Sequence, residues 1–227
     1  MHFSVNGIEL YYKETGQGAP FVLLHGNGES HKIFRALEKL LSKKYRVYAI
    51  DSRDHGKSTR VKGLDYETMM EDVAGFIRGK GIEDPILFGF SDGGIIGLLL
   101  AIRHPGLISR LIVGGANTHP AEIKMIYTIG VKIAHFFLRN QKHKMMLAQP
   151  DITKAELNSI TVPTLVTAGS NDVVKGDHTA YIAENIPGSA LVILEGETHS
   201  SYIREGKKLY DTIERFLDGK QQAGEME

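Results

Sequence analysis

In residues 86–102, an apolar run short enough for a buried strand leads through a glycine-flanked serine into an apolar run of helical length. The turn reads Gly-x-Ser-x-Gly, and Gly89 and Gly93 remove side chains that would collide where a strand meets a helix tightly. This pattern predicts a nucleophile elbow, with the Ser91 hydroxyl above the sheet and helix-start N–H groups aimed at the same point. A glycine-rich turn that merely contains serine would match the motif too, so the assignment depends on the rest of the chain.

Apolar runs of strand length alternate with amphipathic stretches along most of the chain. The predicted strands are residues 3–5, 8–12, 21–24, 46–50, 86–88, 111–114, 164–168 and 190–194. Asn6-Gly7 predicts a tight hairpin between the first two, and the later alternation predicts parallel strands with helices on both faces. The sequence therefore indicates an α/β fold whose ligands gather at the carboxyl ends of the strands.

The length of 227 residues and the apolar content of 42% predict one domain with a full core. We expect a single domain over residues 1–227, with a small lid insertion at about 119–158, where two helical segments replace the alternation. From Gly219 onward the chain is polar, which predicts a frayed end.

Composition narrows the classes of partner and chemistry. Lysine plus arginine and aspartate plus glutamate are balanced at 27 each, so no net charge favours nucleic acid or a membrane as a partner. The absence of cysteine excludes disulfides, thiolate metal sites and a cysteine nucleophile. No basic segment followed by an apolar stretch opens the chain, and no run is long enough to cross a bilayer, so a cytoplasmic protein is expected.

Two further residues follow predicted strands and complete a set with Ser91. Asp172 comes after the run at 164–168, and His199 comes after the run at 190–194. A serine hydroxyl needs a base to take its proton, and the base needs a third group to hold its tautomer, so the order Ser, Asp, His predicts a triad. The alternative is that Asp172 only caps the next segment and Asp177 is the acid.

These motifs together resemble the α/β-hydrolase superfamily over nearly the whole chain, from His25-Gly26 to His199. The resemblance implies an eight-stranded, mostly parallel sheet with Ser91 as nucleophile, His199 as general base and then acid, and Asp172 as the orienting carboxylate. It also implies an oxyanion hole formed by the backbone N–H groups of Asn27 and Asp92.

Asp92 has two interpretations. An acidic residue in the first turn of a helix is favoured by the helix dipole, which explains it without any substrate. Alternatively, its carboxylate faces the pocket and pairs with a substrate ammonium group. The stretches 91–94 and 115–117 resemble the biphenyl-hydrolase-like enzymes, which cleave amino-acid esters, and this resemblance implies the second role.

The predicted lid carries apolar residues at helical spacing among basic ones. We expect an amphipathic helix with its apolar side over the pocket, so that Ile133, Phe136 and Phe137 contact substrate. The alternative is a membrane-surface or anionic-partner role for the same segment.

The sequence thus predicts a serine hydrolase that cleaves a small carboxylic ester or thioester through an acyl-enzyme. No cofactor or metal is expected, because the chain lacks paired histidines at helical spacing near a carboxylate. Lactone, amide or carbon–carbon bond hydrolysis on the same scaffold remains an alternative, as does a ligand-sensing hydrolase with slow turnover and a protein partner.

Overall fold

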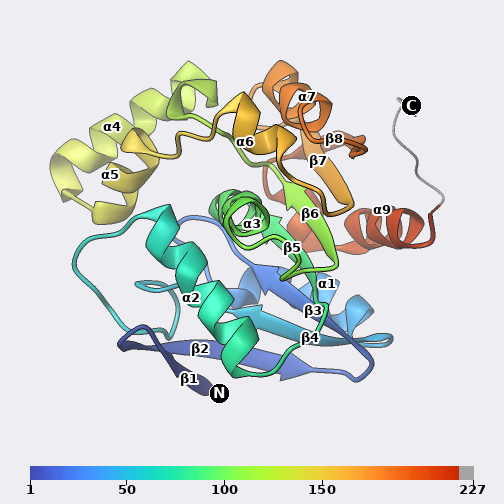
Figure 1. Ribbon diagram of the computed structural model, residues 1–227. Helices are drawn as coiled ribbons and strands as arrows, with labels where there is room; N and C mark the ends of the chain where they lie inside the picture. The colour runs from blue at the N-terminus through green and yellow to red at the C-terminus, as the bar shows by residue number, and fades with distance from the viewer. Residues whose placement is uncertain (220–227) are drawn as a thin grey trace.

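The structure is a computed structural model, and it describes residues 1–219 (Figure 1); residues 220–227, which include most of the predicted frayed end, lie outside the described residues. The strands are β1 (His2–Val5), β2 (Ile8–Thr15), β3 (Ala19–Leu24), β4 (Tyr45–Ile50), β5 (Ile86–Phe90), β6 (Arg110–Gly114), β7 (Thr164–Asn171) and β8 (Ala190–Thr198). The helices are η1 (His31–Phe34), α1 (Arg35–Leu41), α2 (Tyr66–Gly79), α3 (Asp92–Arg103), η2 (Pro120–Glu122), α4 (Met125–Leu138), α5 (Gln141–Ala148), α6 (Lys154–Asn158), α7 (Gly176–Glu184), α8 (Ser201–Glu205) and α9 (Lys207–Leu217).

All eight strands form one sheet in the order β1-β2-β4-β3-β5-β6-β7-β8. The pairs β1–β2 and β2–β4 are antiparallel, and every pair from β4 to β8 is parallel. Asn6 and Gly7 turn the first hairpin with φ angles of 46° and 76°, which suit these two residue types. The predicted eight-stranded, mostly parallel α/β sheet is therefore confirmed.

Helices cover both faces of the sheet, and the central strands are buried on both sides (Figure 1). In β3, Val22 and Leu24 belong to the apolar core on the face that α2, α3 and α7 cover, whereas Phe21 and Leu23 belong to the core on the face that α1, α8 and α9 cover. This alternation follows from the two-residue period of a strand. Buried apolar side chains on both faces fix the central strands.

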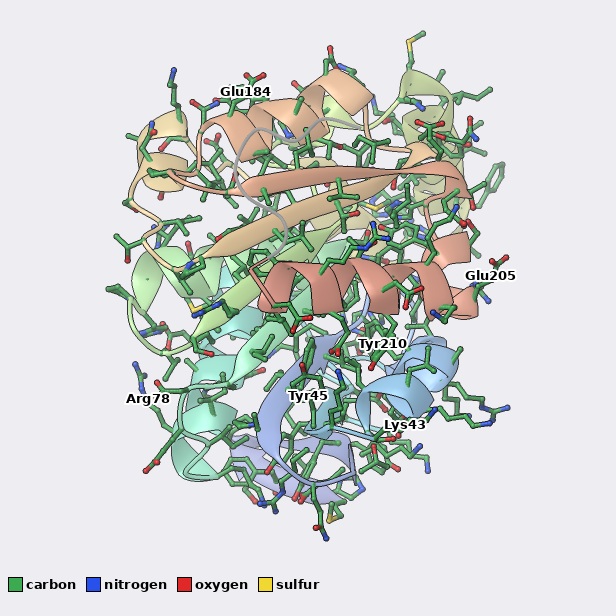
Figure 2. All side chains as sticks on the ribbon, turned by 90° about the vertical axis from the view of Figure 1, so that its right-hand side faces the viewer. Lys43, Tyr45, Arg78, Glu184, Glu205 and Tyr210 are labelled. Atoms are coloured by element: carbon green, nitrogen blue, oxygen red, sulfur yellow. The ribbon has the colours of Figure 1, made fainter. Side chains whose placement is uncertain are left out.

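One helix on the second face is also tied to the sheet by a polar contact. Figure 2 shows α9 lying across this face, with Tyr210 near Tyr45. The Tyr45 hydroxyl donates a hydrogen bond of 2.9 Å to Glu214 of α9. Apolar packing and this bond together hold the last helix against the sheet.

The carboxyl ends of β3, β5, β6, β7 and β8 meet at one edge, because these strands are all parallel. β7 and β8 run farther than the sequence predicts, since their ladder continues past an irregularity to the pair Asn171–Thr198. Asp172 and His199 therefore come directly after a strand end. Between β6 and β7 lie η2, α4, α5 and α6, in the stretch for which the sequence predicts a lid.

Candidate active site

Ser91 sits at the sharp turn between β5 and α3, with φ of 53° and ψ of −116°. The two flanking residues must be glycines because a side chain at either position would clash with neighbouring backbone. A Cβ on Gly89 would lie 2.0 Å from the Gly93 carbonyl oxygen, and one on Gly93 would lie 2.1 Å from the Leu24 carbonyl oxygen. The local sequence thus forces a strained backbone at the serine, as expected for a side chain held in position above a sheet.

The structure brings Ser91, His199 and Asp172 together in one hydrogen-bonded chain. His199 Nε2 lies 3.1 Å from Ser91 Oγ, and His199 Nδ1 lies 2.7 Å from Asp172 Oδ1. With Nδ1–H donating to the carboxylate, Nε2 is the acceptor that faces the hydroxyl. The Asp172 side chain is 3% exposed and also accepts a hydrogen bond from the Val174 N–H.

The alternative acid, Asp177, lies elsewhere. It is in the first turn of α7, where its carboxylate accepts a hydrogen bond of 2.9 Å from the His178 N–H. This position favours an acidic residue because of the helix dipole. The carboxylate beside His199 is that of Asp172.

Asn27 and Asp92, the two residues expected to form the oxyanion hole, are joined through their side chains. Asp92 is the first residue of α3, so its N–H has no carbonyl partner within that helix. Its carboxylate accepts hydrogen bonds of 2.9 Å from Asn27 Nδ2 and 2.8 Å from the Tyr66 hydroxyl. Asn27 Nδ2 also donates to the Lys142 carbonyl of α5, at 3.4 Å. This network fixes the loop after β3 against α3 and α5.

The Asp92 carboxylate is buried, and its hydrogen-bond donors among residues 1–219 are neutral. Burial raises its pKa to about 6, although the bonds from Tyr66 and Asn27 act in the opposite direction. Sequence reasoning did not single out Tyr66, because its position at the start of α2 marks only a helix.

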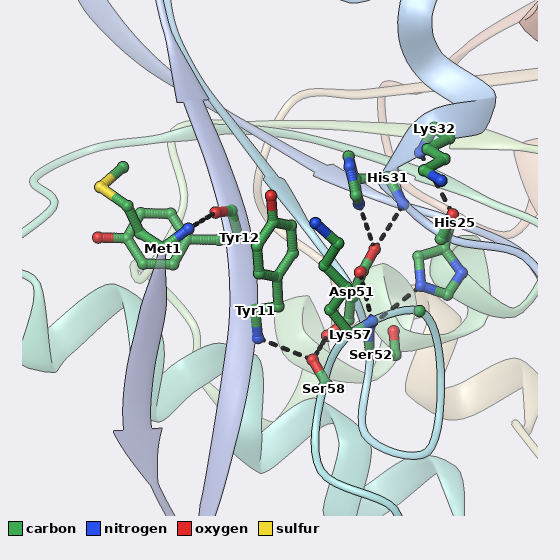
Figure 3. Close-up of polar contacts among 12 residues, drawn as sticks. Met1, Tyr11, Tyr12, His25, His31, Lys32, Asp51, Ser52, Lys57 and Ser58 are labelled. Atoms are coloured by element: carbon green, nitrogen blue, oxygen red, sulfur yellow. Dashed lines mark hydrogen bonds and ion pairs between the residues drawn. The ribbon is translucent and has the colours of Figure 1, made fainter.

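Buried histidines hold the loops after β3 and β4, as Figure 3 shows. His25 Nε2 accepts a hydrogen bond of 3.1 Å from the Ser52 N–H, and His25 Nδ1 lies 2.8 Å from the Gly26 carbonyl. Asp51 accepts hydrogen bonds from both the backbone N–H and the ring Nδ1 of His31, each at 2.7 Å. The loop that carries Asn27 is therefore anchored by a histidine that must keep Nε2 unprotonated.

This anchor predicts a loss of stability in acid. Burial, with the nearby His55 charge, lowers the pKa of His25 from 6.5 to about 4. Between these values the unfolded chain binds more protons than the folded one, so the free energy of unfolding falls as pH falls. The contribution of His25 is on the order of 3 kcal/mol over that interval. We expect urea denaturation to show that the free energy of unfolding decreases less between pH 7 and pH 4.5 in His25→Gln than in the parent protein.

An exposed histidine provides the control for this measurement. In His2→Gln, the free energy of unfolding should decrease between pH 7 and pH 4.5 by as much as in the parent, since His2 lies at the surface. An equal decrease in the free energy of unfolding in the parent and in His25→Gln would contradict the assignment of this acid sensitivity to His25.

A cavity of about 330 Å³ opens beside Ser91 and His199. Its walls are formed by these two residues, by Asn27 and Asp92, and by side chains from α4, α5 and the loops after β6 and β7. The lining residues are Gly26, Asn27, Glu29, Phe90, Ser91, Asp92, Gly115, Asn117, Ile123, Tyr127, Val131, His143, Met146, Val173, Val174 and His199. Glu29, which sequence reasoning did not single out, places a buried oxygen without a hydrogen-bond partner at this site, and burial raises its pKa.

The structure places Ile133, Phe136 and Phe137 away from this cavity, contrary to the expectation that they contact substrate. Their side chains are 55%, 75% and 76% exposed, and none of them lines the cavity. Tyr127 and Val131 of α4 line it instead. The helix is apolar around most of its circumference, so periodicity alone does not identify the inward side.

The family model described as alpha/beta hydrolase fold matches residues 19–140. The chain belongs to the α/β hydrolase fold family. The superfamily resemblance in the sequence is confirmed by this match, which spans the elbow and the loop after β3.

Relatives of this α/β hydrolase include hydrolases matched over nearly their full length. A pimeloyl-(acyl-carrier protein) methyl ester esterase from Aliivibrio fischeri is 30% identical, over 92% of this chain and 97% of the relative. The human serine hydrolase BPHL is 27% identical, over 94% of this chain and 84% of the relative. A solved thermophilic esterase from Thermogutta terrifontis superposes with a TM-score of 0.81 at 21% identity, covering 96% of each chain, which supports the fold alone.

Proposed function

We propose that this α/β hydrolase is a carboxylesterase that cleaves a small ester or thioester through an acyl-enzyme. The observation that carries the proposal is the hydrogen-bonded chain of Ser91, His199 and Asp172 at the wall of a cavity. A hydroxyl, an imidazole and a buried carboxylate in this order are the parts that nucleophilic acyl transfer needs.

In the proposed reaction, Ser91 Oγ attacks the ester carbonyl carbon while His199 Nε2 takes the hydroxyl proton. Asp172 holds Nδ1–H and stabilises the imidazolium. The N–H groups of Asn27 and Asp92 stabilise the oxyanion, and the leaving alcohol or thiol takes the proton from His199. Water then attacks the acyl-enzyme with His199 as base, which releases the acid and restores Ser91.

The size and lining of the cavity favour small acyl groups. At about 330 Å³, it is near the lower end of the range for small-molecule sites. Ile123, Val131, Val173 and Val174 give it an apolar wall. The relative from Aliivibrio fischeri, named as a methyl ester esterase, also supports a carboxylic ester as substrate.

The proposal is tested with 4-nitrophenyl esters from acetate to decanoate. We expect a burst of nitrophenol close to one per protein molecule, followed by steady turnover that is fastest for short chains. Mass spectrometry of the quenched protein should locate the acyl group on Ser91. Tight binding with negligible turnover would favour the ligand-sensing alternative, and acylation at another residue would overturn the mechanism.

A substrate amino group would find a carboxylate in this cavity, which leads to a prediction for Asp92. Asp92 lines the cavity and pairs only with neutral donors. We expect Asp92→Asn to lower kcat/KM for an α-amino ester about tenfold more than for the ester without the amino group. Because the pKa of Asp92 is about 6, the parent's preference for the amino ester should increase as pH rises through that value. Equal losses on both esters would leave Asp92 only the role of holding Asn27.

A further inference from the structure

The outer side of α4 carries a concentration of exposed apolar side chains. Among residues 1–219, Met1 is the one exposed large apolar residue outside this helix. Those within it are Met125, Ile126, Tyr127, Ile129, Ile133, Phe136, Phe137 and Leu138, with exposures from 48% to 76%, and of these Tyr127 belongs to the side of the helix that lines the cavity. An exposed apolar area of this kind marks a surface that binds another molecule. Figure 1 shows α4 at the upper left edge of the molecule.

The spacing along α4 separates this outer side from the side that faces the cavity. Ile126, Ile129, Ile133 and Phe137 follow one another at intervals of three or four residues, which places them on one side of the helix. Val131, which lines the cavity, faces the opposite way. Substrate contact thus accounts for one side of α4 and leaves the other unexplained.

Cations border the outer side. Residues 123–150 contain five lysines and arginines and no aspartate or glutamate. Two of these cations are used internally, since Lys142 pairs with Asp54 and Lys124 donates to the Asp172 carbonyl.

The other three cations of this segment are exposed. Lys132, Arg139 and Lys144 form no ion pair with any residue in the described part of the chain. Lys132 lies within α4, and Arg139 directly follows the exposed residues 136–138 at the carboxyl end of the helix. Exposed apolar side chains with unpaired cations beside them would complement a partner that has an apolar interior and anionic groups at its surface.

We propose that the outer side of α4 docks this protein on the surface of an anionic lipid bilayer. A projecting, convex helix needs a partner that can deform around it, and the acyl–headgroup boundary does so while its phosphates meet the cations. A second copy of this segment would offer these cations no acidic partner, because residues 123–150 contain no aspartate or glutamate. In residues 1–219, no helix has the length and apolar character needed to cross a bilayer, so the contact is peripheral.

Docking in this way places the active-site cavity beside the bilayer, because Tyr127 and Val131 line the cavity from the same helix. The docking itself does not depend on the proposed esterase activity. The net charge of zero for the whole chain predicts no membrane partner, but that value averages over this locally basic segment.

Cosedimentation with vesicles tests the proposal on the full chain. One vesicle type is phosphatidylcholine alone, and the other contains about 30% phosphatidylserine. We expect at least about tenfold tighter binding to the anionic vesicles, weakened at high salt. The variants Phe136→Ser/Phe137→Ser and Lys132→Glu/Arg139→Glu should each weaken binding to the anionic vesicles about tenfold.

The matched control is Lys43→Glu/Arg215→Glu, which removes two exposed cations from α1's end and from α9. This variant should bind like the parent, and thermal unfolding checks that every variant is folded. Equal binding by all variants, or none by the parent, would overturn the proposal. So would a dimer in sedimentation equilibrium that Phe136→Ser/Phe137→Ser dissociates without any vesicle binding. Binding to polyglutamate that needs Lys132 and Arg139 but neither phenylalanine would indicate an acidic protein partner instead, and would also overturn it.

Discussion

Replacing Ser91 by alanine is expected to lower kcat for 4-nitrophenyl butyrate by roughly three to six orders of magnitude. In the proposed mechanism the Ser91 oxygen forms the acyl-enzyme, so without it only binding and oxyanion stabilisation would remain to accelerate hydrolysis. The fold should persist, because the side chain is partly exposed at the end of β5 and, among residues 1–219, its hydroxyl has His199 as its one hydrogen-bond partner. Stopped-flow detection of nitrophenol measures both the burst and the steady rate.

Two further variants make this measurement specific. Ser91→Ala/His199→Ala should lose no more activity than Ser91→Ala, because groups that act as a unit are not additive. Ser109→Ala, which alters a serine just before β6 at the opposite end of the sheet, should keep full activity. A Ser91→Ala protein that still shows the burst would mean that another residue is acylated.

Gly115→Ala is expected to lower kcat by roughly a hundredfold or more, with a smaller effect on KM. Gly115 has φ of 59°, and a Cβ there would lie 3.0 Å from His199 Nδ1 and 3.1 Å from Asp172 Oδ2. The added methyl group would displace the contact between imidazole and carboxylate. Steady-state kinetics with 4-nitrophenyl butyrate, together with thermal unfolding, would measure the two effects separately.

The substitution Gly106→Ala is the control that separates the effect of a positive φ from the effect of a steric clash. Gly106 has φ of 82°, but nothing lies within 4 Å of the position that a Cβ would take. Gly106→Ala should therefore cost stability of about 1 kcal/mol, as expected where φ is positive, and leave kcat unchanged. Full activity in Gly115→Ala would show that catalysis tolerates displacement of the histidine and the aspartate from their close contact.

The sheet and the hydrogen-bonded chain at its edge could be predicted because their signals are local. Apolar runs identify strands, and parallel strands bring their carboxyl ends together, so residues that follow strands come close whatever their distance in sequence. Ser91, Asp172 and His199 each follow such a run. The extent of the strands was less predictable: β7 and β8 extend through polar residues that the apolar pattern did not include.

The lining of the cavity could not be predicted in the same way. α4 is apolar on both sides, so the sequence alone does not show that Val131 faces the cavity and Phe137 faces outward. Tyr66 and Glu29 reach the site through packing between distant segments, and neither lies in a motif. The net charge of the whole chain also gave no sign of the basic stretch at residues 123–150.

The side-chain amide of Asn27 links α3, which begins beside Ser91, to α5. The same nitrogen donates to Asp92 beside the nucleophile and to the Lys142 carbonyl in α5. Lifting α5 to admit an ester or release an acid would stretch the second bond and free the asparagine to shift. In the proposed reaction, passage of substrate and product past α5 would thus be coupled to the position of the residue whose N–H stabilises the oxyanion.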